Sequence, residues 1–195
     1  MDSKWTLTMD CKTIEIDNLH ILKMNPIEAV ELIMNNYGND IKKFVYTYVN
    51  NEVDADDITQ EVFVTVYLKL NTFKGDSTLK SWIYSIAANK CKDHLRKHRL
   101  RHNNLIEKII KQQKVNEATV STANSQSTLE DYLFEKILEL PIKYREVIIL
   151  YYYKELPIKE IGLILKMKEA TLQSRLLRGR KKLRDLIQER VNELG

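Results

Sequence analysis

A polar stretch rich in Ser and Thr, residues 116–128, separates two longer segments in which apolar residues recur at helical spacing. This composition is typical of an interdomain linker, because it offers little apolar surface to bury. The 195 residues are therefore divided into two units, each the size of a small domain. The whole chain holds only 5 Gly and 3 Pro, fewer than the tight turns of an all-β protein require. We predict an all-α protein in which a flexible linker joins two small helical domains.

The apolar periodicity also places the domain boundaries. We assign residues 25–98 to the first helical domain, residues 99–128 to the linker and residues 129–195 to the second helical domain. Residues 105–110 could still form a short helix before the polar stretch. Residues 1–24 form an N-terminal extension of unknown role.

Neither secretion nor membrane insertion is expected from the sequence. The extension, in which Met24 is an alternative start of translation, lacks the apolar stretch of a signal peptide. The longest apolar run, residues 147–153, is far shorter than the roughly 18 residues of a membrane span. The two cysteines, Cys11 and Cys91, are too few and too far apart for a disulfide framework or a zinc ribbon. We therefore expect a cytoplasmic protein.

In the first domain, the sequence predicts turns at residues 37–40 and 50–51 and a loop at residues 71–76. Asp54 is expected to open one helix and Ser77 to cap the next, since both side chains can accept a hydrogen bond from the first turn of a helix.

In the second domain, residues 127–130 fit a capping box, and residues 144–153 are apolar enough to predict a buried helix. Pro157 suits the first turn of another helix, and residues 166–168 predict a short turn before a long basic helix that begins near Glu169. A helix, a short turn and a basic second helix are typical of a helix-turn-helix.

The formal net charge of +4 conceals an alternation of acidic and basic blocks. Residues 1–68 hold 5 Lys/Arg and 12 Asp/Glu, a net charge of −7, whereas residues 69–101 hold 9 and 2, a net charge of +7. Residues 102–155 hold 7 and 8, residues 156–184 hold 9 and 2, and the last eleven residues carry −2. Two separate basic blocks indicate two contacts with a polyanion, although two solvated helical faces would give the same composition.

The acidic block contains a helix that cannot face DNA. Five acidic residues lie between Glu52 and Glu61, and no Lys or Arg occurs between Phe44 and Leu68. Phosphates would repel such a helix. The more specific interpretation is that this helix binds a protein partner of opposite charge. The simpler alternative is that it is a solvated acidic surface.

The first basic block interleaves Phe73, Trp82 and Tyr84 with lysines and arginines. Basic grooves with aromatic platforms suit unstacked or single-stranded bases, whereas the simpler alternative makes Phe73 and Trp82 core residues. In the second basic block, small hydroxyl side chains precede arginines at steps of three and four on the last helix. This pattern suits a helix that enters the major groove with its N-terminal end, and its alternative is a solvated basic face.

Segments of both domains, taken in order, resemble bacterial RNA polymerase sigma factors of the sigma-70 family. Residues 57–63 are similar to the helix of conserved region 2, and residues 73–96 are similar to the promoter-opening segment. Three further segments are similar to region 4 of these sigma factors: residues 140–147, 160–162 and 171–183. The match covers residues 25–98 and 129–187, and the lack of a third domain between them resembles the compact extracytoplasmic-function (ECF) group.

The resemblance implies three sets of binding residues. The set for core RNA polymerase, at a coiled coil of its largest subunit, is Asp54, Asp57, Gln60, Glu61 and Phe63. The set that reads and melts the minus-ten promoter element is Asn71, Phe73, Lys74, Lys80, Trp82, Tyr84, Asn89, Lys90, Asp93, Arg96 and Lys97. The set that reads the minus-thirty-five element is Lys168, Ala170, Thr171, Gln173, Ser174, Arg175, Arg178, Lys181 and Lys182.

The resemblance also implies contact with the flap region of the polymerase and control by an anti-sigma protein. It implies no enzymatic activity, and thus no catalytic residue, cofactor, metal ion or small-molecule substrate. Three positions depart from the family pattern: Gly162 replaces the usual Ala, Lys166 the usual Gly of the turn, and Gln173 a usual Lys. If Lys166 adopts a positive φ, its side chain costs roughly 1 kcal/mol there.

Two other classes of function, a free-standing regulator and an enzyme, would require different features. A free-standing helix-turn-helix regulator would share the basic last helix, but it would bind duplex DNA without the polymerase. An enzyme such as a nuclease would need a carboxylate–histidine cluster, a Gly-rich phosphate loop or a nucleophile motif, and none is evident in the sequence. Cys91, His94, His98 and His102 follow helical steps, but they extend over roughly 16 Å and cannot all bind one metal ion.

Overall fold

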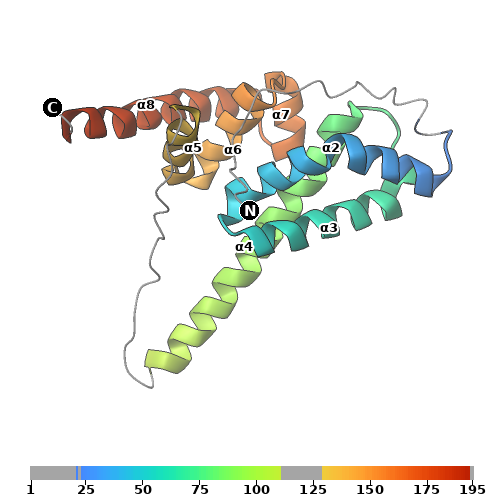
Figure 1. Cartoon of the computed structure of the whole chain (residues 1–195), viewed down its shortest axis with the longest axis horizontal. Helices are drawn as coiled ribbons and strands as arrows, with labels where there is room; N and C mark the ends of the chain where they lie inside the picture. The colour runs from blue at the N-terminus through green and yellow to red at the C-terminus, as the bar shows by residue number, and fades with distance from the viewer. Residues whose placement is uncertain (1–20, 22, 111–128, 194–195) are drawn as a thin grey trace.

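The computed structural model describes residue 21 and residues 23–110 and 129–193 (Figure 1). Every regular element among these residues is helical, which confirms the all-α prediction. The first unit contains α2 (Pro26–Val49), α3 (Glu52–Lys69), the 3₁₀ turn η1 (Leu70–Thr72) and α4 (Leu79–Ile110). The second contains α5 (Leu129–Glu139), α6 (Ile142–Ile148), the π-helical turn η2 (Ile149–Tyr153), α7 (Ile158–Leu165) and α8 (Glu169–Glu193). None of the described helices is long and apolar enough to span a bilayer.

Helix α2 continues through residues 37–40, so the turn predicted there is wrong. Tyr37 and Ile41 are both buried and carry the apolar face of α2 across the predicted break. This burial outweighs the roughly 1 kcal/mol that Gly38 costs inside a helix. The turn predicted at residues 50–51 is confirmed, because Asn50 ends α2 in the left-handed conformation with φ 50°.

Two helices begin at residues other than the predicted ones. Asn51 caps α3 by accepting a hydrogen bond from the Asp54 N–H at 3.0 Å, so α3 begins before Asp54. Thr78, not Ser77, caps α4, because its Oγ1 accepts from the Ser81 N–H at 3.2 Å. In each case a side-chain oxygen three residues upstream satisfies an N–H of the first turn.

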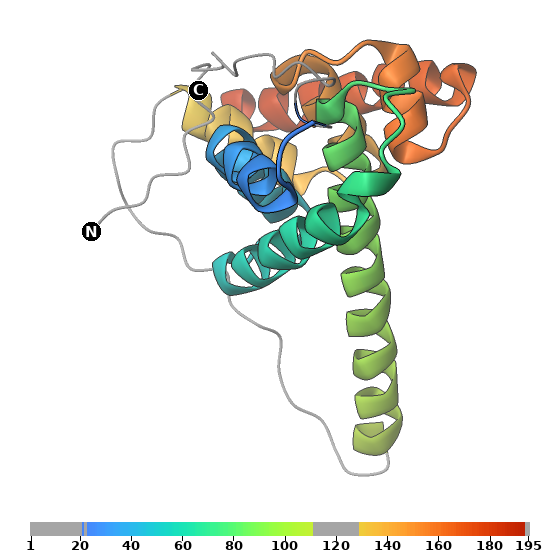
Figure 2. The ribbon, with the colours of Figure 1, turned by 90° about the vertical axis from the view of Figure 1, so that its right-hand side faces the viewer.

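Helix α4 is longer than the sequence predicted, because it continues to Ile110 through the first part of the expected linker. Its C-terminal half stands away from the other helices (Figure 2). The rest of that linker, most of the N-terminal extension and the first half of the capping box at residues 127–130 lie outside the described residues.

The short turn before α8 lies at residues 166–168, as predicted. Lys166 has φ 54° and ψ 51°, a left-handed conformation in which a side chain is disfavoured. The N–H groups of Lys166 and Met167 both donate to the Gly162 carbonyl, which closes the end of α7. A Cβ at Gly162 would lie 3.0 Å from the Met167 carbonyl oxygen, so this tight turn explains the departure from Ala.

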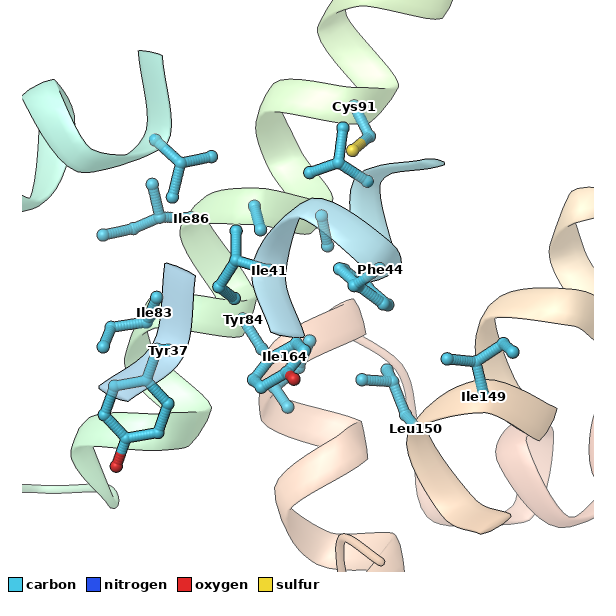
Figure 3. Packing of buried hydrophobic residues seen from close by; sticks show 14 of the residues in the cluster. Tyr37, Ile41, Phe44, Ile83, Tyr84, Ile86, Cys91, Ile149, Leu150 and Ile164 are labelled. Carbon is cyan, nitrogen blue, oxygen red and sulfur yellow. The ribbon is translucent and has the colours of Figure 1, made fainter. Parts of the chain in front are cut away.

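The two units pack against each other and share one hydrophobic core. Phe44 of α2 and Tyr84 of α4 make an edge-to-face contact with ring centroids 5.1 Å apart. Ile164 of α7 and Leu150 of η2 lie beside these rings (Figure 3). Burial of such side chains stabilises this arrangement of the two units.

Candidate nucleic-acid and protein interfaces

The acidic surface lies on α3. Asp57, Gln60 and Glu61 are exposed and occupy neighbouring helical positions, so they can contact one partner together. Glu61 forms an ion pair with Lys90 of α4 at 3.1 Å, and Asp54 lies 3.7 Å from His94 Nε2. The acidic residues near the start of α3 also suit the positive end of its helix dipole.

Phe63 does not lie on this surface. Its side chain is buried in the core between the helices of the first unit, which corrects its assignment to a protein interface. Sequence reasoning instead missed Val64, Tyr67 and Leu68, which are exposed apolar side chains on the second half of α3. The sequence pattern could have identified them, because they lie outside the helical face that carries the buried residues of α3.

The predicted minus-ten residues differ in exposure: most are exposed or partly buried, and two are buried. The exposed group is Asn71, Lys74, Asn89, Asp93, Arg96 and Lys97. Lys80, Trp82 and Lys90 are partly buried. The structure therefore brings most of this set to the surface of η1, the loop after it and α4.

Two aromatic members of the set are core residues in this arrangement. Tyr84 is 0% exposed, which corrects the prediction that it contacts DNA. Phe73 is also buried and packs on Trp82, with ring centroids 5.1 Å apart. The alternative that made Phe73 a core residue is thus the correct one, and it leaves Trp82 as the partly exposed aromatic ring of the set.

The predicted recognition face lies on the first half of α8 and on the turn before it. Its exposed members are Lys168, Ala170, Thr171, Gln173, Arg178, Lys181 and Lys182, while Ser174 and Arg175 are partly buried. Leu172 and Leu176 are buried on the opposite face and attach α8 to the unit. A hollow beside the recognition face is lined by Lys143, Tyr144, Ala170, Thr171, Ser174, Arg175 and Arg178.

Close packing of α6 against α8 positions this face. Gly179 allows the approach, because a Cβ there would lie 3.0 Å from Ile148 Cδ1. Arg175 Nη1 donates to Glu146 Oε1 of α6 at 3.1 Å. The guanidinium is thereby held at the edge of the hollow.

Glu146 is a functional candidate that sequence reasoning missed. Its side chain is 3% exposed, and its other oxygen accepts from Tyr48 at 2.9 Å and Lys92 at 3.0 Å. Burial and the adjacent carboxylate raise the pKa of Tyr48 well above its usual value. The available signal was a charged residue within an otherwise strongly apolar segment.

Comparisons with known proteins agree with this geometry. The chain matches Sigma-70 region 2 over residues 33–101 and Sigma-70, region 4 over residues 130–183. It is 30% identical over 168 residues to the ECF RNA polymerase sigma factor SigM of Bacillus subtilis, covering 85% of this chain and 99% of SigM. It is also 30% identical to SigW of the same organism, covering 86% of this chain and 94% of SigW.

Solved structures share the fold. The sigma factor RpoE of Bartonella quintana, solved in complex with the anti-sigma factor NepR, has a TM-score of 0.66 at 19% identity and covers 81% of this chain and 96% of its own. CnrH, solved with the cytosolic domain of CnrY, has a TM-score of 0.62 at 20% identity and covers 88% of this chain and 95% of its own. This chain thus belongs to the ECF group of the sigma-70 family, the non-enzymatic factors that bind core RNA polymerase and direct promoter-specific transcription initiation.

Proposed function

We propose that the three surfaces divide the work of initiation, with α3 binding core polymerase and with α4 and α8 binding the two promoter elements. The observation that carries this proposal is the segregation of charge. Asp57 and Glu61 are exposed on α3, whereas exposed lysines and arginines gather on α4 and on the first half of α8. A polymerase coiled coil of complementary charge suits α3, and phosphates suit the other two helices.

The protein partner has apolar as well as charged contacts on α3. The exposed side chains of Val64, Tyr67 and Leu68 continue the helix beyond Glu61. Such a surface, with an apolar part beside a charged part, is typical of protein interfaces rather than DNA interfaces. We therefore include these three residues in the polymerase interface.

The minus-ten surface suits melted DNA. Trp82 is partly exposed and is supported from beneath by the buried ring of Phe73. A supported aromatic ring can stack with an unpaired base, while Lys74 and Arg96 contact phosphates. We propose that the flipped non-template base binds near the loop at residues 71–76.

The minus-thirty-five surface suits a duplex. Thr171, Gln173 and Ser174 occupy the first turns of α8, where side chains reach base edges in the major groove. Arg178, Lys181 and Lys182 follow and suit phosphate contacts. Arg175, held by Glu146, is the member best oriented by a partner within the protein.

We also propose that an anti-sigma protein controls this factor in the cytoplasm, where core polymerase is found. Support comes from the two solved relatives, each of which was determined with such a protein or with the cytosolic domain of a partner.

The alternative role of a free-standing regulator is tested by binding with and without core polymerase. The purified chain is titrated against a pool of genomic duplexes, alone and after addition of core enzyme. We expect retention of specific fragments only with core. Specific binding by the chain alone, unchanged by core enzyme, would favour the regulator.

A further inference from the structure

One buried carboxylate connects the two units. Glu146 belongs to α6 of the second unit and accepts from Arg175 of the same unit at 3.1 Å. It also accepts from Tyr48 of α2 at 2.9 Å and pairs with Lys92 of α4 at 3.0 Å, and these two residues belong to the first unit. Separation of the units therefore breaks two of the three interactions and retains the one with Arg175.

Further polar contacts surround this connection. Lys154, whose side chain is 3% exposed, pairs with Asp40 of α2 at 2.8 Å. Glu160 of α7 accepts from Thr78 at 3.0 Å and from Ser81 at the start of α4. Arg145 Nη1 donates to the Thr47 carbonyl at 2.6 Å. The interface thus combines the shared apolar core with several charged groups that water can solvate after separation.

This composition favours a reversible interface. Buried ion pairs add little net stability compared with apolar residues, because each charge loses its hydration on burial. When the units separate, the same charges recover that hydration, whereas a purely apolar interface would leave only exposed hydrophobic surface. Such an interface therefore suits two units that separate and associate again.

In the packed arrangement, the minus-ten surface on α4 and the minus-thirty-five surface on α8 are too close together to contact both promoter elements at once. The nitrogens of Lys92 and Arg175 contact the two oxygens of one carboxylate, so they lie within about 1 nm of each other. Arg96 of the minus-ten set lies one helical turn beyond Lys92. The centres of the minus-ten and minus-thirty-five elements are roughly 25 base pairs apart, or about 85 Å along straight DNA. The packed units cannot occupy both elements.

We propose that Glu146 is the centre of an intramolecular latch that holds this sigma factor in a closed, inactive arrangement. In the closed arrangement the carboxylate binds both units, and in the open arrangement it keeps only Arg175 and so continues to orient the minus-thirty-five reader. Opening precedes engagement of the promoter by both units. This inference rests on the proposed function of α4 and α8, but the closed state itself is measurable without DNA or polymerase.

The test measures the distance between the units in the full-length chain. Dyes are attached at Glu28→Cys in α2 and Asp185→Cys in α8, both exposed positions, in a background in which Cys11 is replaced by Ser and Cys91 is buried. The latch variant is Tyr48→Phe/Lys92→Met, which removes only the first unit's donors to Glu146. The control is Lys42→Met, which breaks an ion pair with Asp56 inside the first unit. Single-molecule energy transfer then reports closed and open populations.

We expect mainly short distances for the parent and the control, and a roughly tenfold or greater rise in the open-to-closed ratio for the latch variant. The apparent affinity for purified core polymerase should rise by a similar factor, because the competent fraction rises. Equal distance distributions for parent and latch variant, or a parent that is already extended, would overturn the latch. A shift in distance, with parent and latch variant both binding core polymerase and with equal affinity, would show that the closed arrangement is not inactive.

These outcomes separate the latch from the function on which it rests. If the distance shifts but neither protein binds core polymerase, the proposed function fails and the latch remains. If both proteins bind core polymerase equally and the distances are identical, the proposed function remains and the latch fails.

Discussion

Lys92 of α4 and Arg175 of α8 bind the same buried carboxylate, that of Glu146. The two cations come from different units, and each is predicted to lie close to DNA-reading residues of its own helix. Their shared acceptor therefore couples the packing of the units to the exposure of the promoter-reading surfaces. The core of the first unit continues into the second through Tyr84 and Ile164, so this coupling has an apolar part as well.

Removal of the Glu146 carboxylate should destabilise the packed protein. In Glu146→Ala the Tyr48 hydroxyl loses its acceptor in a buried position, while Lys92 and Arg175 can still reach water because both are partly exposed. We expect a loss of about 2–3 kcal/mol in the free energy of unfolding. Urea denaturation followed by circular dichroism measures it. Glu139→Ala, which removes a surface ion pair with Lys136, should cost less than about 1 kcal/mol.

Charge reversal on α3 should abolish polymerase binding without unfolding the protein. Asp57→Lys/Glu61→Lys places positive charge where a complementary partner expects negative charge. We expect at least a hundredfold weaker competition for core polymerase, with an unchanged circular dichroism spectrum. Glu135→Lys/Glu139→Lys makes the same change in net charge on α5 and should compete normally. Normal competition by the α3 variant would show that this helix is not the polymerase interface.

Truncation of Arg175 should weaken recognition of the upstream element and leave core binding intact. A specific base or phosphate contact contributes about 1–3 kcal/mol, so upstream-element binding by holoenzyme should fall roughly 10- to 100-fold in Arg175→Ala. Thr171→Ala tests the same face without touching Glu146. Arg180→Ala is the matched control, because Arg180 lies on the same helix and donates to Tyr152. An equal loss in all three variants would indicate a general charge effect instead.

The first-unit core should lose stability at alkaline pH. Burial raises the pKa of the Cys91 thiol, and burial together with Glu146 raises that of Tyr48. Both groups hold their protons more tightly when folded, so their contribution is complete below the pKa values of the unfolded chain and declines as pH rises above them. The slope above about pH 8.5 should approach 1.4 kcal/mol per pH unit for Cys91.

Two measurements check this prediction. In a Cys11→Ser background, Cys91 should react with a thiol reagent at pH 8.5 only after denaturation, since the folded thiol stays protonated. Cys91→Ala should flatten the fall in stability between about pH 8.5 and 10. Rapid labelling of Cys91 in the folded protein would contradict the burial that raises its pKa.

One residue in the turn of the helix-turn-helix lowers the stability of the fold, and its replacement should raise the free energy of unfolding. Lys166 has φ 54°, so Lys166→Gly removes a steric cost and should raise the free energy of unfolding by about 0.5–1 kcal/mol. Lys159→Gly inside α7 is the control and should lower it by about 1 kcal/mol. Gly162→Ala should give no gain despite the better helix propensity of Ala, because its Cβ would press on the Met167 carbonyl. Thermal denaturation compares the three variants.

Helix positions, the helix-turn-helix turn and the distribution of charge could be predicted from the sequence. They depend on local periodicity, on caps and on composition, which a single sequence contains. The errors have equally physical causes. The predicted turn at residues 37–40 failed because the burial of Tyr37 and Ile41 outweighs a helix-weakening glycine. Helix α4 is continuous to Ile110, where the sequence indicated only a short separate helix at residues 105–110.

Long-range packing could not be predicted from the sequence. The family resemblance places Phe63 and Tyr84 in the binding sets, yet tertiary contacts bury both. The acceptor shared by Lys92 and Arg175 depends on helices from both units meeting at Glu146, and no local pattern encodes such a meeting. Charge within an apolar segment was the available hint, and it identifies the residue but not its partners.

Run-off transcription measures directly whether this protein directs promoter-specific initiation. Purified core polymerase is combined with this protein and a pool of genomic promoter fragments, and new transcript starts are sequenced, with the Asp57→Lys/Glu61→Lys variant as the matched control. We predict a discrete set of starts that appears with the parent protein and disappears with the variant. No added starts with the parent protein, together with tight binding of duplex DNA by the chain alone, would contradict it.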